Sequence, residues 1–253
     1  MTRNVRDWLS GQTLTSLDVL DEKLLPAEQT AQLVGTRIGP AARRGKYLCL
    51  PLGAQVLILH FRMTGKAVLE TTPRRHVRAR LRTDAVAVAF VDTRRLGRAW
   101  LLAAGDVPAF FEAIPLGPEP WPGPRSGAWW GERLAGLRGA VKPAMMRQDR
   151  IAGLGNIAAA EICHRAGVHP ARLVPELTAA DYAALAQACP AFIEHVLAAE
   201  SGPEVHYVSE GAPTPAPFLV YGRAGALCSC GAQIERIPQS GRATFFCPTC
   251  QRR

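Results

Sequence analysis

Hydrophobic and polar residues alternate, or form short apolar runs, through the first hundred positions of this chain. The alternation is strict at His76–Arg82, where Val, Ala and Leu would face one way and three arginines the other. Turn residues such as Gly, Pro and Asp separate these segments, so each is predicted to be a β-strand. The predicted strands are Gln12–Leu20, Tyr47–Leu52, Gln55–Phe61, His76–Arg82, Ala85–Val91 and Arg98–Leu102. This pattern favours a β-sandwich or a β-barrel.

A proline-rich stretch then separates this region from one with helical periodicity. Six prolines fall between Pro108 and Pro124, which marks a connection between domains. The helices predicted after it are Trp129–Leu137, Pro143–Arg150, Asn156–Ala166, Ala179–Cys189 and Ala191–Glu200. Residues 201–220 contain Gly and Pro without periodicity and are predicted to form a loop. We therefore expect an α+β protein with a strand domain, a linker, a helical domain and a cysteine-bearing segment, over 1–107, 108–125, 126–217 and 218–253 respectively.

Two closely spaced cysteine pairs lie in the last segment, Cys228-Ser-Cys230 and Cys247-Pro-Thr-Cys250. The 16 residues between the pairs are enough for a hairpin that brings the four thiols together. Four thiolates suit tetrahedral Zn(II), with Zn–S distances of ~2.3 Å in a closed structural site. The first pair is one residue tighter than the usual C-x-x-C. A disulfide or unused thiols are the alternatives, but an odd number of cysteines, seven, and the lack of a signal peptide disfavour a disulfide framework.

The positive charge of the chain is concentrated in one segment. The net charge is +9, but residues 36–100 hold fourteen Lys and Arg against three acids, so the rest of the chain sums to −2. Such a basic field predicts a polyanionic partner, because phosphate neutralisation supplies most nucleic-acid affinity. A solvated basic face is the alternative. No apolar run approaches the ~20 residues needed to cross a bilayer, so we expect no membrane segment.

Four short motifs carry candidate binding residues. Gly153-Leu-Gly155-Asn156 opens a predicted helix, where Asn156 is a suitable N-cap and N–H groups could hold a phosphate; Lys142 lies one helix earlier. Arg43-Arg44-Gly-Lys46 leads into a strand and could also grip phosphates. Met63 ends an apolar strand, and Asp92–Gly97 is a basic turn. Taken singly, these motifs also fit an ordinary helix start, a solvated turn or a core methionine.

In combination, these motifs resemble those of formamidopyrimidine-DNA glycosylases and their endonuclease VIII relatives. The resemblance runs from about Gly11 to the C-terminus, and its helix pair and cysteine hairpin are specific when found together. The motifs that carry it are Arg43-Arg-Gly-Lys-Tyr-Leu48, His60-Phe-Arg-Met-Thr-Gly65, Asp92-Thr-Arg-Arg-Leu-Gly97, Leu116-Gly-Pro-Glu-Pro120, Asp149 through Gly155-Asn-Ile157, Ala166-Gly-Val-His-Pro170, Val220-Tyr-Gly-Arg223 and Arg242-Ala-Thr-Phe-Phe-Cys247. The resemblance implies an N-terminal β-sandwich, a helix–two-turn–helix domain and a C-terminal four-cysteine zinc finger hairpin.

The resemblance also implies roles for individual residues. Three match positions that hold DNA phosphates around an extruded nucleotide: Lys46, Asn156 and Arg242. Three match the side chains that fill the hole left in the duplex, with Leu in place of the commoner Phe: Met63, Arg94 and Leu96. Four match the ligands of one structural Zn(II): Cys228, Cys230, Cys247 and Cys250. Lys142 is a further candidate for binding DNA.

The sequence departs from the family at its start. Family members begin, after removal of Met, with Pro-Glu; the Pro amine attacks the sugar C1′ and forms a Schiff base, while the Glu handles protons. Here the sequence opens Met1-Thr2-Arg3-Asn4. Measured back from Gly11, it is shorter by about eight residues, roughly two helical turns. The helix around the nucleophile is therefore expected to be largely missing.

Three explanations compete for this departure. The start codon is misassigned and a Met-Pro-Glu lies upstream; or the protein binds damaged or abasic DNA without cutting it; or the α-amine of Thr2, exposed by Met removal, attacks an abasic sugar. The last is chemically feasible, because an α-amino group has a pKa of ~7.7–8.0 and is partly unprotonated at neutral pH.

The sequence thus predicts a DNA-repair protein whose partner is double-stranded DNA with a damaged or missing base. An active protein would remove an oxidised base and nick the abasic site by β-elimination; a silent one would only recognise the lesion. We expect a monomer in the bacterial cytoplasm, associated with the nucleoid. A sequence-specific regulator is disfavoured, because the cysteine hairpin lacks the helix of a major-groove reader.

Overall fold

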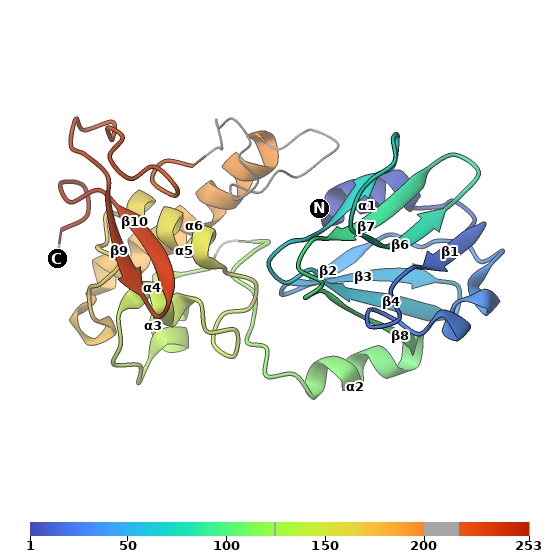
Figure 1. Cartoon of the computed structure of the whole chain (residues 1–253). Helices are drawn as coiled ribbons and strands as arrows, with labels where there is room; N and C mark the ends of the chain where they lie inside the picture. Colours follow the sequence, from blue (N-terminus) through green and yellow to red (C-terminus); the bar gives the residue numbers. More distant parts are fainter. Residues whose placement is uncertain (124, 200–217, 253) are drawn as a thin grey trace. The chain divides into compact units, whose positions relative to one another are not determined.

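Two four-stranded antiparallel sheets are built from the first hundred residues (Figure 1). One sheet has the order β1-β6-β7-β5, and the other has the order β2-β3-β4-β8. The strands are β1 (Ser16–Val19), β2 (Ala42–Arg44), β3 (Tyr47–Leu52), β4 (Gln55–His60), β5 (Gly65–Leu69), β6 (Val77–Arg82), β7 (Ala87–Asp92) and β8 (Arg98–Ala103). The computed structural model describes residues 1–123, 125–199 and 218–252, which fold as two units divided between Ile114 and Pro115.

A shared apolar core fills the space between the two sheets of the first unit. Leu48, Leu50 and Leu57 enter it from one sheet, and Leu81 and Phe90 enter it from the other. Strand β3 buries every second residue, as a strand with one covered face requires. Because both sheets contribute to one core, the fold is a β-sandwich, as the sequence predicts, and not a barrel.

Helix α1 (Thr2–Leu9) adds to this core at the start of the chain. Val5 and Leu9 lie one helical turn apart and are 3% and 1% exposed. The sulfur of Met1 accepts a hydrogen bond of 3.4 Å from the backbone N–H of Ala67 on β5. The expectation that this helix is largely missing is therefore wrong, because eight residues form it and its apolar side is buried.

The strand predictions miss three features of the sandwich. Strands β2 and β5 were not predicted, and only Ser16–Val19 of the expected strand Gln12–Leu20 belongs to a sheet. Before β1, the backbone bonds instead to the loop at 35–38. The register of β6 shifts between Val77 and Ala79, so Arg78 does not point to solvent as strict alternation implies; it is 2% exposed.

The second unit is mainly helical. Its helices are α3 (Gly127–Leu134), α4 (Val141–Met145), α5 (Asn156–Arg165) and α6 (Ala179–Ala199). They pack around Trp130, Leu134, Met145, Ile162 and Leu185. Helix α2 (Val107–Glu112) lies in the first unit and overlaps the start of the range 108–125 expected to be a linker. The short 3-10 helices are η1 (Ala27–Gln29), η2 (Ala31–Leu33), η3 (Ala104–Asp106) and η4 (Val174–Glu176).

Helix α6 replaces two helices that the sequence predicts on either side of Pro190. A proline removes one backbone N–H and crowds the carbonyl four residues earlier, which usually ends a helix. Here Cys189 and Phe192 are 0% and 6% exposed in the helical core, and this packing keeps the helix continuous. Most of the loop predicted over 201–220 lies outside the described residues.

A two-stranded hairpin, β9 (Glu235–Gln239) and β10 (Arg242–Phe246), completes the second unit. Ser240 and Gly241 connect the strands and both have positive φ, +49° and +72°, which suits a tight two-residue turn. The hairpin lies between the two cysteine pairs, as predicted. Val220, Ile234 and Phe245 form a small core beside the cysteines. Among the described residues, no helix has both the length and the apolarity to cross a membrane.

Candidate functional site

The four cysteines of the hairpin converge on one point. Their sulfurs all lie within 4.8 Å of one another. Cys230 and Cys247 are 3.4 Å apart, and Cys228 and Cys250 are 3.9 Å apart, so each contact joins the two pairs. Gly231, at φ +87°, turns the chain directly after the shorter first pair, and its N–H donates to the carbonyl of Cys228. The tighter spacing therefore still brings both thiols to the site.

This set of donors fits one structural Zn(II) ion. The backbone N–H of Cys230 lowers the pKa of Cys228 to about 5 and favours its thiolate form. The side chain of Cys230 raises the pKa of Cys250 to about 12, so the four thiols do not all ionise unless a cation offsets their charges. All seven cysteines lie in the described part of the chain and are free thiols, so the disulfide alternative fails. Four sulfurs in a closed cluster are the ligand set of a structural zinc site.

A second cluster joins helices α4 and α5 to strand β10. The ammonium of Lys142 donates to the Asn156 Oδ1 atom at 2.6 Å and to the Thr244 Oγ1 atom at 2.8 Å. The Asn156 amide nitrogen donates to the carbonyl of Ala243 at 3.0 Å and to the hydroxyl of Tyr221 at 3.2 Å. Asn156 is therefore held on both sides of its amide group.

One expectation for this cluster needs correction. Asn156 is not the N-cap of α5; Gly155 holds that position and Asn156 is the first helical residue, with its side chain turned to β10. Lys142 is 1% exposed, and its ammonium donates to two protein oxygens; its part in binding DNA stays a prediction. Burial lowers the pKa of Lys142 to about 8, and the nearby charge of Arg242 acts in the same direction.

Arg242 lies at the exposed start of β10, next to this cluster. The tight turn Ser240-Gly241 sets its position, and the bond from Asn156 to Ala243 fixes the following peptide. Three predicted residues of the second unit are thus brought together: Lys142, Asn156 and Arg242.

Glu161 belongs to the same region, although no motif in the sequence points to it. Its carboxylate is 0% exposed and accepts hydrogen bonds from the backbone N–H groups of Leu219, Val220 and Tyr221, at 2.8–2.9 Å. These bonds hold the segment that presents the Tyr221 hydroxyl to Asn156. A single acid within the apolar run Ile-Ala-Ala-Ala-Glu-Ile-Cys was the available signal, because such an acid is buried only when it has partners.

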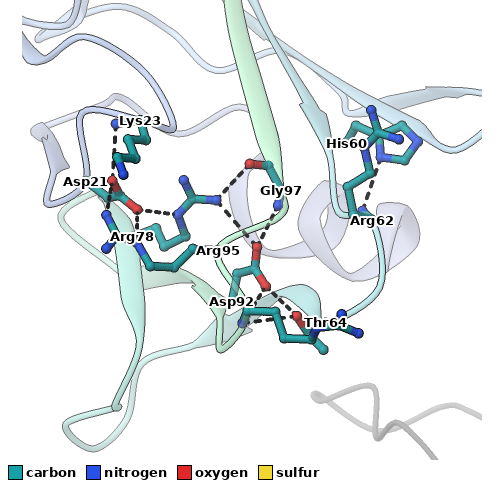
Figure 2. A network of polar contacts seen from close by, with 10 residues as sticks. Asp21, Lys23, His60, Arg62, Thr64, Arg78, Asp92, Arg95 and Gly97 are labelled. Carbon is teal, nitrogen blue, oxygen red and sulfur yellow. Dashed lines mark hydrogen bonds and ion pairs between the residues drawn. The ribbon is translucent and has the colours of Figure 1, made fainter.

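In the first unit, two exposed loops carry the predicted hole-filling residues. Met63 is 64% exposed and Leu96 is 40% exposed, so the alternative of a core methionine is wrong. The guanidinium of Arg94 lies 3.6 Å from the sulfur of Met63, which brings the two loops into contact. The hydroxyl of Thr64 and the backbone N–H of Arg94 both donate to Asp92, as Figure 2 shows for Thr64.

Lys46 lies in the turn between β2 and β3, and its side chain is exposed. Gly45, at φ +56°, makes this turn, and its carbonyl accepts a bond of 2.7 Å from Arg43. His60 lies on the neighbouring strand, where its ring packs against Tyr47 at 4.7 Å. Burial lowers the pKa of His60 to about 4, with the charges of Arg62 and Lys46 acting in the same direction, so the imidazole is neutral at physiological pH.

Comparison with known proteins shows which family this chain belongs to. Family models match the chain in three parts: the formamidopyrimidine-DNA glycosylase N-terminal domain at residues 1–99, the formamidopyrimidine-DNA glycosylase H2TH domain at 116–205, and a zinc finger found in FPG and IleRS at 229–253. A formamidopyrimidine-DNA glycosylase of Gluconobacter oxydans is 36% identical over 267 residues, which cover 99% of this chain and 96% of that relative. The chain belongs to the formamidopyrimidine-DNA glycosylase family.

Other members of the family agree in sequence and in fold. The formamidopyrimidine-DNA glycosylase of Edwardsiella ictaluri is 34% identical, over 99% of this chain and 96% of its own. Lactococcus lactis Fpg, solved with DNA containing an abasic site, matches with a TM-score of 0.87 and 28% identity, over 100% of this chain and 97% of that one. MutM in complex with DNA containing carbocyclic 8-oxo-G matches with a TM-score of 0.84 and 27% identity, over the same shares. The predicted α+β fold, with its sandwich, H2TH domain and four-cysteine finger, is confirmed.

The family's catalytic dipeptide has no counterpart at the first residues of this sequence. Met1 caps helix α1 and Thr2 is its first residue, half-buried at the helix start. The bond from Ala67 to the Met1 sulfur ties this helix start to β5. Thr2 remains the candidate for an attacking amine, and its role stays a prediction.

Proposed function

We propose that this protein is a DNA-repair glycosylase that binds duplex DNA at a damaged or missing base and holds the nucleotide outside the helix. The exposed contact between Met63 and Arg94 carries the proposal, together with the exposed Leu96 two residues after Arg94. Extruding a base costs a few kcal/mol of lost stacking, which side chains inserted in its place partly offset. Two large apolar side chains held in solvent on adjacent loops are suited to that task.

Phosphate binding is assigned to exposed cations and to the start of α5. Lys46 and Arg242 present their charges at the tips of tight turns. Both N–H bonds of the Asn156 side chain are used inside the protein, so its part is to fix the helix start, where backbone N–H groups attract phosphate. Lys142 acts behind this surface, because its buried ammonium orients the Asn156 amide.

We favour a catalytically active glycosylase over a protein that only recognises lesions, because the named relatives are glycosylases. In the reaction, an amine attacks C1′ as the bond to the base breaks, and the resulting Schiff base allows loss of the C2′ proton and cleavage of the C3′–O bond. The α-amine of Thr2, exposed by Met removal, is the candidate nucleophile. The relatives are bacterial, which supports action on nucleoid DNA in the cytoplasm, and binding as a monomer is sufficient for this chemistry.

Two measurements test the proposal. Affinity for a duplex with a stable abasic analogue should exceed affinity for the intact duplex of the same sequence; equal affinities would exclude lesion binding. Borohydride reduction during reaction with a natural abasic site should leave a covalent protein–DNA adduct. Tight abasic-site binding without any adduct would instead support the alternative, a protein that recognises lesions without cutting DNA.

A further inference from the structure

A network of two acids and two arginines lies directly behind the hole-filling loops, and all of it except the exposed Arg95 is buried (Figure 2). Arg78, turned inward by the bulge in β6, donates through Nε to Asp21 at 2.7 Å and through a terminal nitrogen to Asp92 at 3.4 Å. Asp21 and Asp92 are 8% and 0% exposed. The three charges are therefore shielded from water, and Arg78 is the shared counter-charge of the two carboxylates.

Asp92 fixes both loops at once. One of its oxygens accepts from Thr64, which follows Met63, and from the backbone N–H of Arg94. The other accepts from the backbone N–H of Gly97 at 2.6 Å. Arg78 donates to the carbonyl of Gly97 at 2.7 Å, so the residue after Leu96 is held at both its backbone polar groups.

Asp21 fixes the turn between Arg94 and Leu96. Arg95 lies between them and adopts φ +53°, a left-handed conformation that costs energy for a residue with a side chain. Its guanidinium makes two bonds to Asp21, at 2.7 and 2.8 Å. The paired arginines keep the pKa of Asp21 well below its usual range, so both bonds are charge-assisted. These two bonds to Asp21 offset the conformational free energy that the left-handed backbone of Arg95 costs. Leu96, the next residue, is thereby directed outward.

We propose that Asp21 and Arg78 are positioning residues that hold the loops of Met63 and Leu96 in the geometry needed to enter the space of an extruded nucleotide. The inference rests on the proposed function and deepens it, because it assigns discrimination between damaged and intact duplex to buried residues behind the loops. Asp21 lies 57 residues from Arg78 and 74 from Arg95 in sequence, so one buried carboxylate couples three separate segments.

The test compares Asp21→Asn with a matched control, Glu70→Gln. Glu70 pairs with Arg80 on the same strand as Arg78, at 2.7 Å, and neither residue belongs to either loop. Each protein is titrated with intact duplex and with a duplex carrying a stable abasic analogue. In the second duplex, 2-aminopurine beside the abasic position reports unstacking by an inserted side chain.

Asp21→Asn should lower the preference for the abasic duplex by about tenfold and remove the fluorescence rise, while affinity for intact duplex stays unchanged. Glu70→Gln should keep both signals. The inference is overturned if Asp21→Asn keeps them, or if both variants lose them equally, since that would indicate general damage to the sheet. If the wild-type protein shows no preference for the abasic duplex, the proposed function fails and this inference fails with it.

A second variant covers the case in which Asp21→Asn does not fold. Arg95→Gln changes a side chain that is 59% exposed and leaves the buried pair of Arg78 and Asp21 in place. It should lower the abasic preference and the fluorescence rise in the same way. If Arg95 only binds phosphate, affinity for the two duplexes would fall equally, and that result would count against the inference.

Discussion

At the scale of single residues, burial changes what a charged side chain can do. Lys142 and Arg78 belong to a strongly basic chain, yet they are 1% and 2% exposed and bond to protein oxygens. We therefore propose that their part in DNA binding is indirect, and that each orients a group nearer the surface. The exposed apolar residues Met63 and Leu96 show the reverse, since they lie in water on the loops for which we propose contact with DNA.

Replacing Lys142 should change how stability depends on pH. Its pKa is about 8 in the folded protein and ~10.4 when unfolded, so between these values the unfolded chain binds a proton that the folded chain lacks. This residue thus makes stability rise with pH over that window, by at most about 1.4 kcal/mol per unit. Lys142→Met should remove that rise, measured by urea unfolding from pH 7.5 to 9.5. Lys23→Met, at an exposed lysine, is the control; a parallel pH dependence in wild type and Lys142→Met would refute the assignment.

Gly97 should tolerate no side chain. A Cβ there would lie 2.9 Å from the ring of Phe90 and 3.1 Å from the carboxylate of Asp92. We expect Gly97→Ala to destabilise the protein by about 1–3 kcal/mol, because a well-packed site must shift. Gly105→Ala, where nothing lies within 4 Å, should change stability little. Equal urea midpoints for the two variants would show that the residues around Gly97 can shift to accept a methyl group without loss of stability.

At the scale of elements, short hairpins do the positioning. The turn Ser240-Gly241 sets Arg242, and the cysteines that flank β9 and β10 close the metal site. This finger is small, with a core of a few residues. We therefore expect its folding to depend on the ion, as in other small metal-bound modules.

Metal analysis should find one zinc per chain, and a strong chelator should unfold the finger. Loss of the hairpin would release Thr244 from Lys142, so the chelated protein should also lose its abasic-site preference. Cys230→Ser should behave like the chelated protein, whereas Cys49→Ser, outside the cluster, should keep its zinc. A Cys230→Ser protein with full zinc content would contradict the four-sulfur site.

At the scale of the whole molecule, the sequence predicts features whose residues are close together in the chain. Features that depend on contacts between distant segments could not be predicted from it. The cysteine spacing predicts the metal site because its donors lie within one hairpin. The inward turn of Arg78 could not be predicted, because its partner Asp21 is 57 residues away and a bulge breaks the alternation. The continuity of α6 through Pro190 likewise depends on tertiary packing, which no local pattern records.

DNA affinity should depend on salt through individual exposed cations. Arg242→Ala should reduce the slope of log affinity against log salt by about one and weaken binding to all duplexes alike. Arg236→Ala, an exposed arginine on the other strand of the hairpin, should leave the slope unchanged. An unaltered slope for Arg242→Ala would exclude a contact between Arg242 and a DNA phosphate.

The exposure of Met63 carries a chemical liability. A thioether that is 64% exposed is open to peroxide, which converts it to a polar, chiral sulfoxide. A sulfoxide prefers water to the stacked interior of a duplex, so its insertion would be weakened. The oxidants that damage bases would then also weaken the insertion of Met63 at the damaged sites. Sulfoxide reductase activity would restore the thioether.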